Sequence, residues 1–210
     1  MHRRAYAPDR GGAAGLGFHW NGVTRSMREL AQHITDLVEN SARAGARKVT
    51  VELEKDGDGW LTLRVSDDGS GMSREEAIRA VDPFWTSRTC RRVGLGLPLL
   101  AATAQRCGGS LEIESEPGAG TRITARWRDE HIDAPPLGDL HATLLSALVG
   151  HPEMDLTCRK SENGRLVQID GAEIRRELGD VPITHPLILG WLERHVQDLL
   201  AEGETDGKAD

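Results

Sequence analysis

The chain has 210 residues, which is enough for one sizeable core or for a medium domain with a small second unit. Its 26 Lys and Arg residues and 33 Asp and Glu residues give a net charge of -7, which argues against a protein-wide attraction to nucleic acid, so we expect no nucleic-acid partner. The three cysteines lack the spacing of a disulfide framework or zinc site, and no apolar run approaches roughly 18 residues, so we expect a cytoplasmic protein without a membrane span.

The N-terminal region combines an irregular arm with an amphipathic helix. Residues 1–22 mix Arg, Gly, Ala and Pro without periodicity, and we expect a flexible arm there. A helix is predicted over residues 26–46, and Ser26 and Glu29 have the spacing of a capping box at its start. Apolar residues recur at steps of three and four and predict its core face: Met27, Leu30, Ala31, Ile34, Leu37, Val38 and Ala42.

A second stripe on this helix is polar. His33, Asp36, Asn40 and Arg43 also step by three and four, so a carboxylate, an amide and a guanidinium project along one line. Such groups can hold a water, a metal-bound phosphate and a phosphate charge. On a lone helix the same stripe would be typical of a solvent-exposed face, and only the motifs that follow favour the functional interpretation.

A hairpin leads into a loop that carries acidic residues and glycines. Residues 49–54 and 60–66 alternate as two strands around a turn. The second strand runs into Asp67-Asp68-Gly69-Ser70-Gly71-Met72, where glycines let the backbone pass close to a ligand. Alone, this loop is typical of an ordinary turn. Ser73 and Glu76 predict a second capping box, on a short helix that ends near residue 80.

The next segments suggest an anion site. Residues 82–93 are polar and basic with two adjacent aromatics, and we expect a loop over something anionic. Glycines at 94 and 96 precede a helix predicted over 99–107, where free backbone amides and the helix dipole attract anions. The P-loop sequence is absent. Two strands follow, over residues 110–115 and 121–127, around a Pro-Gly turn.

In this order, the segments of residues 26–128 resemble the ATP-binding domain shared by DNA gyrase, heat-shock chaperone ATPases, sensor histidine kinases and MutL, the GHKL superfamily. VENSARAGA is similar to the MutL form of the first motif, and DDGSGM matches the second motif. DPFWTSR resembles the phenylalanine box of histidine kinases, VGLGLP the lid hinge, and ESEPGAGT the closing strand-turn-strand. The resemblance implies an α+β fold over residues 23–130, a two-layer α/β sandwich of the Bergerat type, with ATP and Mg²⁺ as cofactors.

The resemblance also implies roles for individual residues. Asn40 would offer its carbonyl oxygen to Mg²⁺, and Asp36 would be the catalytic base. Asp67 would accept a hydrogen bond from the amine of adenine, and Thr121 would complete that contact through a water. The other nucleotide-binding residues implied are Arg43, Gly69, Gly71, Met72, Phe84, Arg92, Gly94, Leu95, Gly96 and Leu97.

Three departures from the family pattern bear on activity. Hydrolysing members usually carry Glu where this chain has Asp36, so the base is shorter by one methylene. Arg92 stands where kinases place the first glycine of the lid hinge. We expect no dimerisation helix with a phosphoacceptor histidine before the domain, and we expect His33 to be structural.

The chain changes character at residues 129–139, where charges and a Pro-Pro pair predict a boundary. A helix over 140–149, a hairpin around Asn163-Gly164, a short helix capped by Asp170 and a last helix from Pro186 to about residue 200 predict an αββαα unit. We interpret residues 131–202 as a small accessory domain that docks a protein partner. The last residues, 203–210, are predicted to be a disordered tail.

The leading functional hypothesis is an Mg-ATP-binding, histidine-kinase-like module of the stand-alone kind, acting on or with a separate partner. Whether it is a protein kinase or a slow ATPase stays open. One alternative is a nucleotide-operated switch with little turnover. Another is a MutL-like slow ATPase that dimerises on ATP. The sequence does not determine the oligomeric state.

Overall fold

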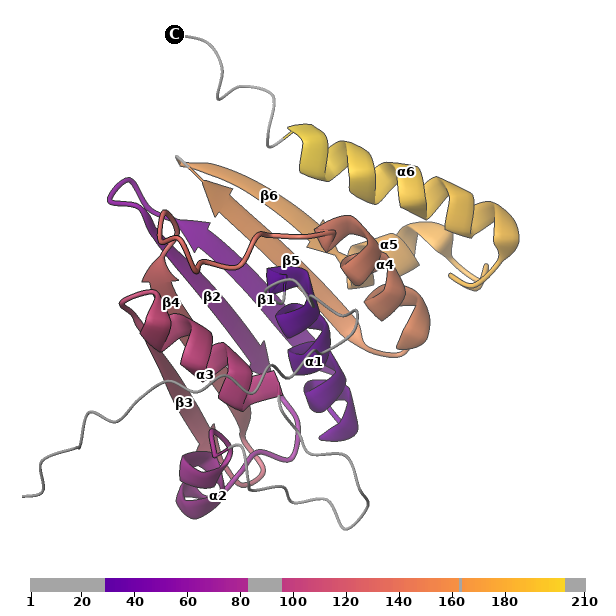
Figure 1. Cartoon of the computed structure of the whole chain (residues 1–210). Helices are drawn as coiled ribbons and strands as arrows, with labels where there is room; N and C mark the ends of the chain where they lie inside the picture. Colours follow the sequence, from indigo (N-terminus) through magenta and orange to yellow (C-terminus); the bar gives the residue numbers. More distant parts are fainter. Residues whose placement is uncertain (1–28, 83–95, 163, 203–210) are drawn as a thin grey trace, which may run out of the picture.

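The computed structural model describes residues 29–82, 96–162 and 164–202, and these contain six helices and six strands (Figure 1). The elements in chain order are α1 (Leu30–Arg43), β1 (Lys48–Lys55), β2 (Trp60–Asp67), α2 (Arg74–Arg79), α3 (Gly96–Arg106), β3 (Ser110–Glu116), β4 (Gly120–Arg128), α4 (Leu140–Gly150), β5 (Asp155–Glu162), β6 (Arg165–Asp170), α5 (Gly171–Leu178) and α6 (Pro186–Glu202).

All six strands belong to one sheet, with the order β3-β4-β2-β1-β5-β6. Neighbouring strands are antiparallel except β1 and β5, which are parallel. A parallel pair needs a crossover, and α4 lies in the connection that supplies it. The predicted α+β class and the αββαα order of the C-terminal part are confirmed. The C-terminal hairpin extends the sheet of the preceding part.

The helices cover one face of the sheet and bury the core against it (Figure 1). Alternation along the strands turns Val49, Val51 and Leu63 inward, where each is at most 1% exposed. The same cluster of buried side chains continues into the C-terminal part, through residues such as Leu148 and Leu156. The hydrophobic core therefore crosses residue 130 without a break, and the division into two domains stays a prediction.

Helix α1 begins later than its apolar pattern suggested, at Leu30, and Ser26 lies outside the described residues. Glu29 occupies the cap position without a side-chain hydrogen bond. Instead, the amides of Leu30 and Ala31 donate to the carbonyl oxygens of Pro136 and Leu137, at 2.9 and 3.0 Å. The predicted linker thus satisfies amides that a helix start leaves free.

The structure contains two of the helix caps that the sequence predicts. Ser73 and Glu76 make the reciprocal bonds of a capping box at the start of α2. Asp170 accepts from the amides of Ala172 and Glu173 at the start of α5. No helix within the described ranges is long and apolar enough to cross a bilayer.

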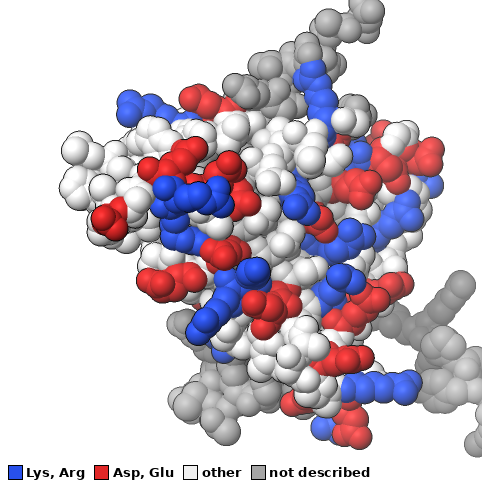
Figure 2. Space-filling view, turned by 180° about the vertical axis from the view of Figure 1, so that it is seen from behind, with Lys and Arg blue, Asp and Glu red and all other residues white. Residues whose placement is uncertain are grey.

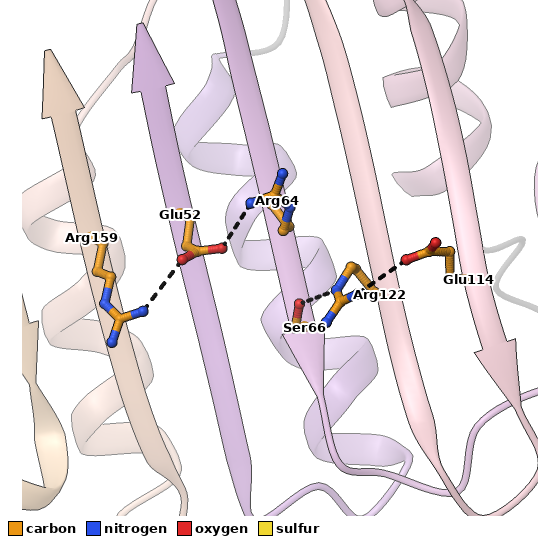
Figure 3. A network of polar contacts seen from close by, with 6 residues as sticks. All are labelled: Glu52, Arg64, Ser66, Glu114, Arg122 and Arg159. Carbon is orange, nitrogen blue, oxygen red and sulfur yellow. Dashed lines mark hydrogen bonds and ion pairs between the residues drawn. The ribbon is translucent and has the colours of Figure 1, made fainter.

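The other face of the sheet carries interleaved charges of both signs (Figure 2). Glu52 lies between Arg64 and Arg159 of the neighbouring strands, at 3.3 and 3.4 Å, and Arg122 bridges Ser66 and Glu114 (Figure 3). Opposite charges on adjacent strands attract one another, so this face is suited to remain in water while the apolar face is covered.

Candidate functional site

The carboxylate of Asp67 is fixed where strand β2 ends. The hydroxyl of Ser41 donates to Oδ2 of Asp67 at 2.7 Å, and the amide of Gly69 donates to Oδ1 at 2.9 Å. Ser41 is 3% exposed, on the side of α1 that faces the sheet. The two donors hold an ionised carboxylate in one orientation, with lone pairs left for a further donor.

The carboxylate of the adjacent Asp68 binds backbone amides at the start of β1. Its Oδ1 accepts from the amides of Lys48 and Arg47, at 2.8 and 2.7 Å. These backbone donors favour the charged form and lower the pKa of the Asp68 carboxyl below its usual range, the bond from Lys48 being the largest cause. Asp68 therefore ties the acidic loop to the start of β1, beside the orienting contacts of Asp67.

The two glycines of this loop are required by packing within the protein. A Cβ atom at Gly69 would lie 2.8 Å from the Cβ of Ala44, and Gly71 has φ of +65°. A Cβ at Gly71 would also overlap the carbonyl oxygen of Glu116. Protein neighbours therefore already require small residues at both positions, and the predicted role of the two glycines beside a ligand stays a prediction.

Polar side chains line the space next to Asp67. Thr121 of β4 pairs with Asp67 of β2, and its hydroxyl lies 2.9 Å from that of Ser115. The Ser115 hydroxyl also accepts from the amide of Met72, at 2.8 Å. A pocket of about 480 Å³ is lined by Asp67, Ser115 and Thr121, and also by Ser66, Glu114 and Arg122 of the charged face of the sheet. The loop, β3 and β4 are thereby linked around one polar pocket.

Helix α1 contributes the charged side of the site. A guanidinium nitrogen of Arg43 donates to Oδ1 of Asn40 at 3.2 Å, and the other pairs with Glu39 at 3.4 Å. Asp36 lies against the start of α3, because a Cβ at Gly96 would be 3.1 Å from Oδ2 of Asp36. The structure therefore brings Asp36 next to Gly96, and Arg43 next to Asn40.

The predicted site residues Phe84, Arg92, Gly94 and Leu95 lie outside the described residues, and their roles stay predictions. Leu97 is half-buried in the first turn of α3. Ser41 and Ser115, whose hydroxyls contact Asp67 and Thr121, were not identified from the sequence. Ser115 left a signal, because strand β3 turns Leu111 and Ile113 inward and the next inward position is polar.

The residues present fit a magnesium ion held through phosphates. Within the described ranges, no group of three or more His, Cys, Asp and Glu side chains is placed to hold a metal by itself. Mg²⁺ prefers oxygen ligands, keeps several waters and is commonly bound through one or two protein groups with substrate phosphates. The amide oxygen of Asn40, which already accepts a hydrogen bond from the cationic Arg43, is an oxygen ligand of this kind.

Comparison with known proteins places this site in a family. The profile described as "Histidine kinase-, DNA gyrase B-, and HSP90-like ATPase" matches residues 26–131. The histidine protein kinase DivJ of Caulobacter vibrioides is 37% identical over 109 residues, half of this chain and 18% of DivJ. The DNA mismatch repair protein MutL of Thermus aquaticus is 36% identical over 124 residues, 56% of this chain and 23% of MutL. The chain thus spans less than a quarter of either relative.

Solved structures give weaker likenesses. The Aquifex aeolicus MutL ATPase domain complexed with ADP has a TM-score of 0.45 at 20% identity, covering 67% of this chain and 62% of that one. Full-length ShkA in complex with AMPPNP has a TM-score of 0.40 at 20% identity, covering 46% of this chain and 20% of that one.

Proposed function

Since the chain belongs to the family of histidine kinase-, DNA gyrase B- and HSP90-like ATPases, we propose that it binds ATP together with Mg²⁺ at the site built by α1, the acidic loop and β4. The observation that carries this proposal is the orientation of Asp67, whose two carboxylate oxygens are held by Ser41 and Gly69 beside Thr121. This chain covers only part of its relatives, so its activity is proposed from its own residues.

Asp67 is the group that selects the base. An ionised carboxylate only accepts hydrogen bonds, and the exocyclic amine of adenine only donates them. Guanine presents a carbonyl oxygen at that position, which would leave two acceptors facing each other in a partly buried pocket. ATP is therefore preferred over GTP, and Thr121 assists through its hydroxyl.

The part of the proposed site that would bind the phosphates lies along α1 and the start of α3. Asn40 offers an oxygen to Mg²⁺, which neutralises and orients the phosphates when bound. The Arg43 guanidinium supplies a positive charge one helical turn away. Backbone amides in the first turn of α3, at Gly96 and Leu97, add the positive end of a helix dipole.

The proposed fate of the bound ATP is phosphoryl transfer to a separate protein partner, in the manner of a histidine kinase. Asp36 would accept the proton of the attacking group as a general base. The partner is expected to bind residues 131–202, where Leu166 and Leu187 expose 62% and 79% of their surface. A second candidate is slow hydrolysis to ADP and phosphate, favoured by the 124-residue match to a MutL.

Calorimetry with ATP and GTP tests the binding proposal. ATP with Mg²⁺ should bind, GTP should bind far more weakly, and Asp67→Asn should abolish ATP binding because its amide presents a donor towards the adenine amine. Asp68→Asn is the matched control, since the same change at the neighbouring residue alters a carboxylate that accepts from the backbone amides of Arg47 and Lys48. Equal affinity for the two nucleotides would refute the adenine assignment.

A second experiment separates transfer from hydrolysis. The protein is incubated with γ-labelled ATP and Mg²⁺, alone and with cell extract, and free phosphate and labelled protein are read separately. Label on a protein supports the kinase-type proposal, and free phosphate alone supports the MutL-like one. Neither product, with ATP bound, would support a nucleotide-operated switch.

A further inference from the structure

A chain of polar contacts runs from the end of α4 to the predicted metal ligand on α1. Nε2 of His151 lies 2.8 Å from Oε1 of Glu39. The other carboxylate oxygen of Glu39 is 3.4 Å from Arg43, and Arg43 donates to Oδ1 of Asn40 at 3.2 Å. Three contacts therefore connect residue 151, in the C-terminal part, with Asn40.

The same part of the chain holds α1 at its other end. The carbonyl oxygens of Pro136 and Leu137 accept from the first amides of α1, and helix α4 packs along it (Figure 1). The helix that carries the site is thus braced by residues 136–151 near both ends. The position of α1 is already fixed by these contacts. The contact of His151 with Glu39 is therefore expected to change the orientation of side chains on α1 rather than the position of the helix.

We propose that His151 is a positioning residue of the nucleotide site, a role that rests on the proposed function. By binding Oε1 of Glu39, His151 fixes the carboxylate so that Oε2 faces Arg43. Glu39 and Arg43 side chains are 41% and 55% exposed, so without an anchor both sample several rotamers. The anchored Glu39 keeps the guanidinium within one helical turn of Asn40, whether or not Arg43 contacts Asn40 itself.

The geometry makes this anchor relevant to the metal. In the structure, Arg43 donates to the oxygen of Asn40 that would bind Mg²⁺. A guanidinium and Mg²⁺ are both cations, so they do not share one oxygen at close range. When Mg-ATP binds, the guanidinium must leave Asn40, and Glu39 holds it within one helical turn, where it can face a phosphate. Loss of His151 therefore weakens the Mg²⁺-dependent part of binding in particular.

The test compares the dissociation constant of ATP in Mg²⁺ with that in EDTA, for the full chain. His151→Ala should reduce the advantage given by Mg²⁺ by about two- to fivefold, the range of a partly exposed contact to a charged group. His151→Gln, which retains a donor, should recover most of it. The effect of His151→Ala should disappear when Arg43→Met is already present, since coupled residues are not additive.

His141→Ala is the matched control, because His141 lies on the same helix and binds the carbonyl oxygen of Glu193 rather than α1. It should leave the ratio of the two constants within about 1.5-fold of the parent. A general loosening of the fold would raise the dissociation constants in Mg²⁺ and in EDTA by the same factor, and would leave their ratio unchanged. That outcome in His151→Ala, with the parent binding Mg-ATP, would overturn this inference alone. If the parent bound no Mg-ATP, the proposed function would fall and this inference with it.

Discussion

The Ser41 hydroxyl and Oδ2 of Asp67 are 2.7 Å apart, and this hydrogen bond joins the last turn of α1 to the end of β2. Asp67 is therefore oriented by the helix next to Asn40 as well as by its own loop, through the amide of Gly69. The two ends proposed to bind the base and the metal share one support, the last turn of α1, since Ser41 follows Asn40 directly in the chain.

Ser41→Ala should weaken ATP binding while the protein remains folded. The carboxylate of Asp67 loses one of two donors and gains rotational freedom, and bonds to charged groups contribute about 1.5–3 kcal/mol, so we expect a loss of affinity of about tenfold or more. Calorimetry measures the affinity. Ser110→Ala, at the exposed start of β3 and outside the lining of this pocket, is the control and should bind ATP as the parent does. An unchanged affinity in Ser41→Ala would contradict the orienting role.

Asp68→Asn should reduce stability in a pH-dependent way. The folded-state pKa of Asp68 is lowered by the amides of Lys48 and Arg47, so its stabilising contribution is present above the unfolded pKa of about 3.9 and is lost as the pH falls through the folded pKa. Thermal unfolding should show a lower melting temperature for the variant at pH 7 and none of this difference near pH 2. A difference that persists at the acidic pH would contradict the charge-based account.

Local patterns predicted most elements of this fold, because burial on one face leaves a mark in the sequence. The alternation of β1 and β2 predicted 49–54 and 60–66, against Lys48–Lys55 and Trp60–Asp67 in the structure. Capping residues left equally local marks, as at Ser73 and Asp170. Periods and caps depend on neighbours within a few residues, so they can be read from a single chain.

Long-range partners left no such mark. Lys48 pairs with Asp155 in the parallel β1–β5 ladder, and nothing in either strand specifies the other. The cap of α1 comes from the backbone carbonyls of Pro136 and Leu137, which every residue type carries. For the site, the spacing of Asp36, Asn40 and Arg43 predicted one helix edge, whereas the His151–Glu39 contact depends on how two helices pack. Such contacts follow from tertiary structure, so the sequence alone did not indicate them.

Gly138→Ala should destabilise the start of α1. Gly138 has φ of +71°, and a Cβ there would lie 2.7 Å from the Cβ of Glu29, so both the backbone and the packing resist a larger residue. We expect a loss of at least about 1–2 kcal/mol and a lower melting temperature by calorimetry. Gly108→Ala separates the two causes, because Gly108 has φ of +75° and no neighbour within 4 Å of its Cβ position. Equal losses in both variants would leave no role for the Glu29 contact.

The proposed role of Asp36 as a general base can be tested by lengthening its side chain. A base must reach the attacking water or hydroxyl at about 2.6–3.2 Å, directly or through one water, and Asp is one methylene shorter than the Glu of hydrolysing relatives. We therefore expect slow hydrolysis in the parent and faster hydrolysis in Asp36→Glu, with ATP affinity preserved in both.

Asp36→Asn should keep ATP binding and lower the rate of phosphate release or phosphoryl transfer by about a hundredfold, the lower end of what a general base contributes. The shape of the side chain is conserved, so the packing against Gly96 is retained, while the negative charge and the ability to take a proton are removed. The rate is measured with γ-labelled ATP at saturating concentration, which separates turnover from binding. If Asp36 only orients a group at the start of α3, the amide serves equally well, and a rate within about twofold of the parent would refute the assignment of Asp36 as the base.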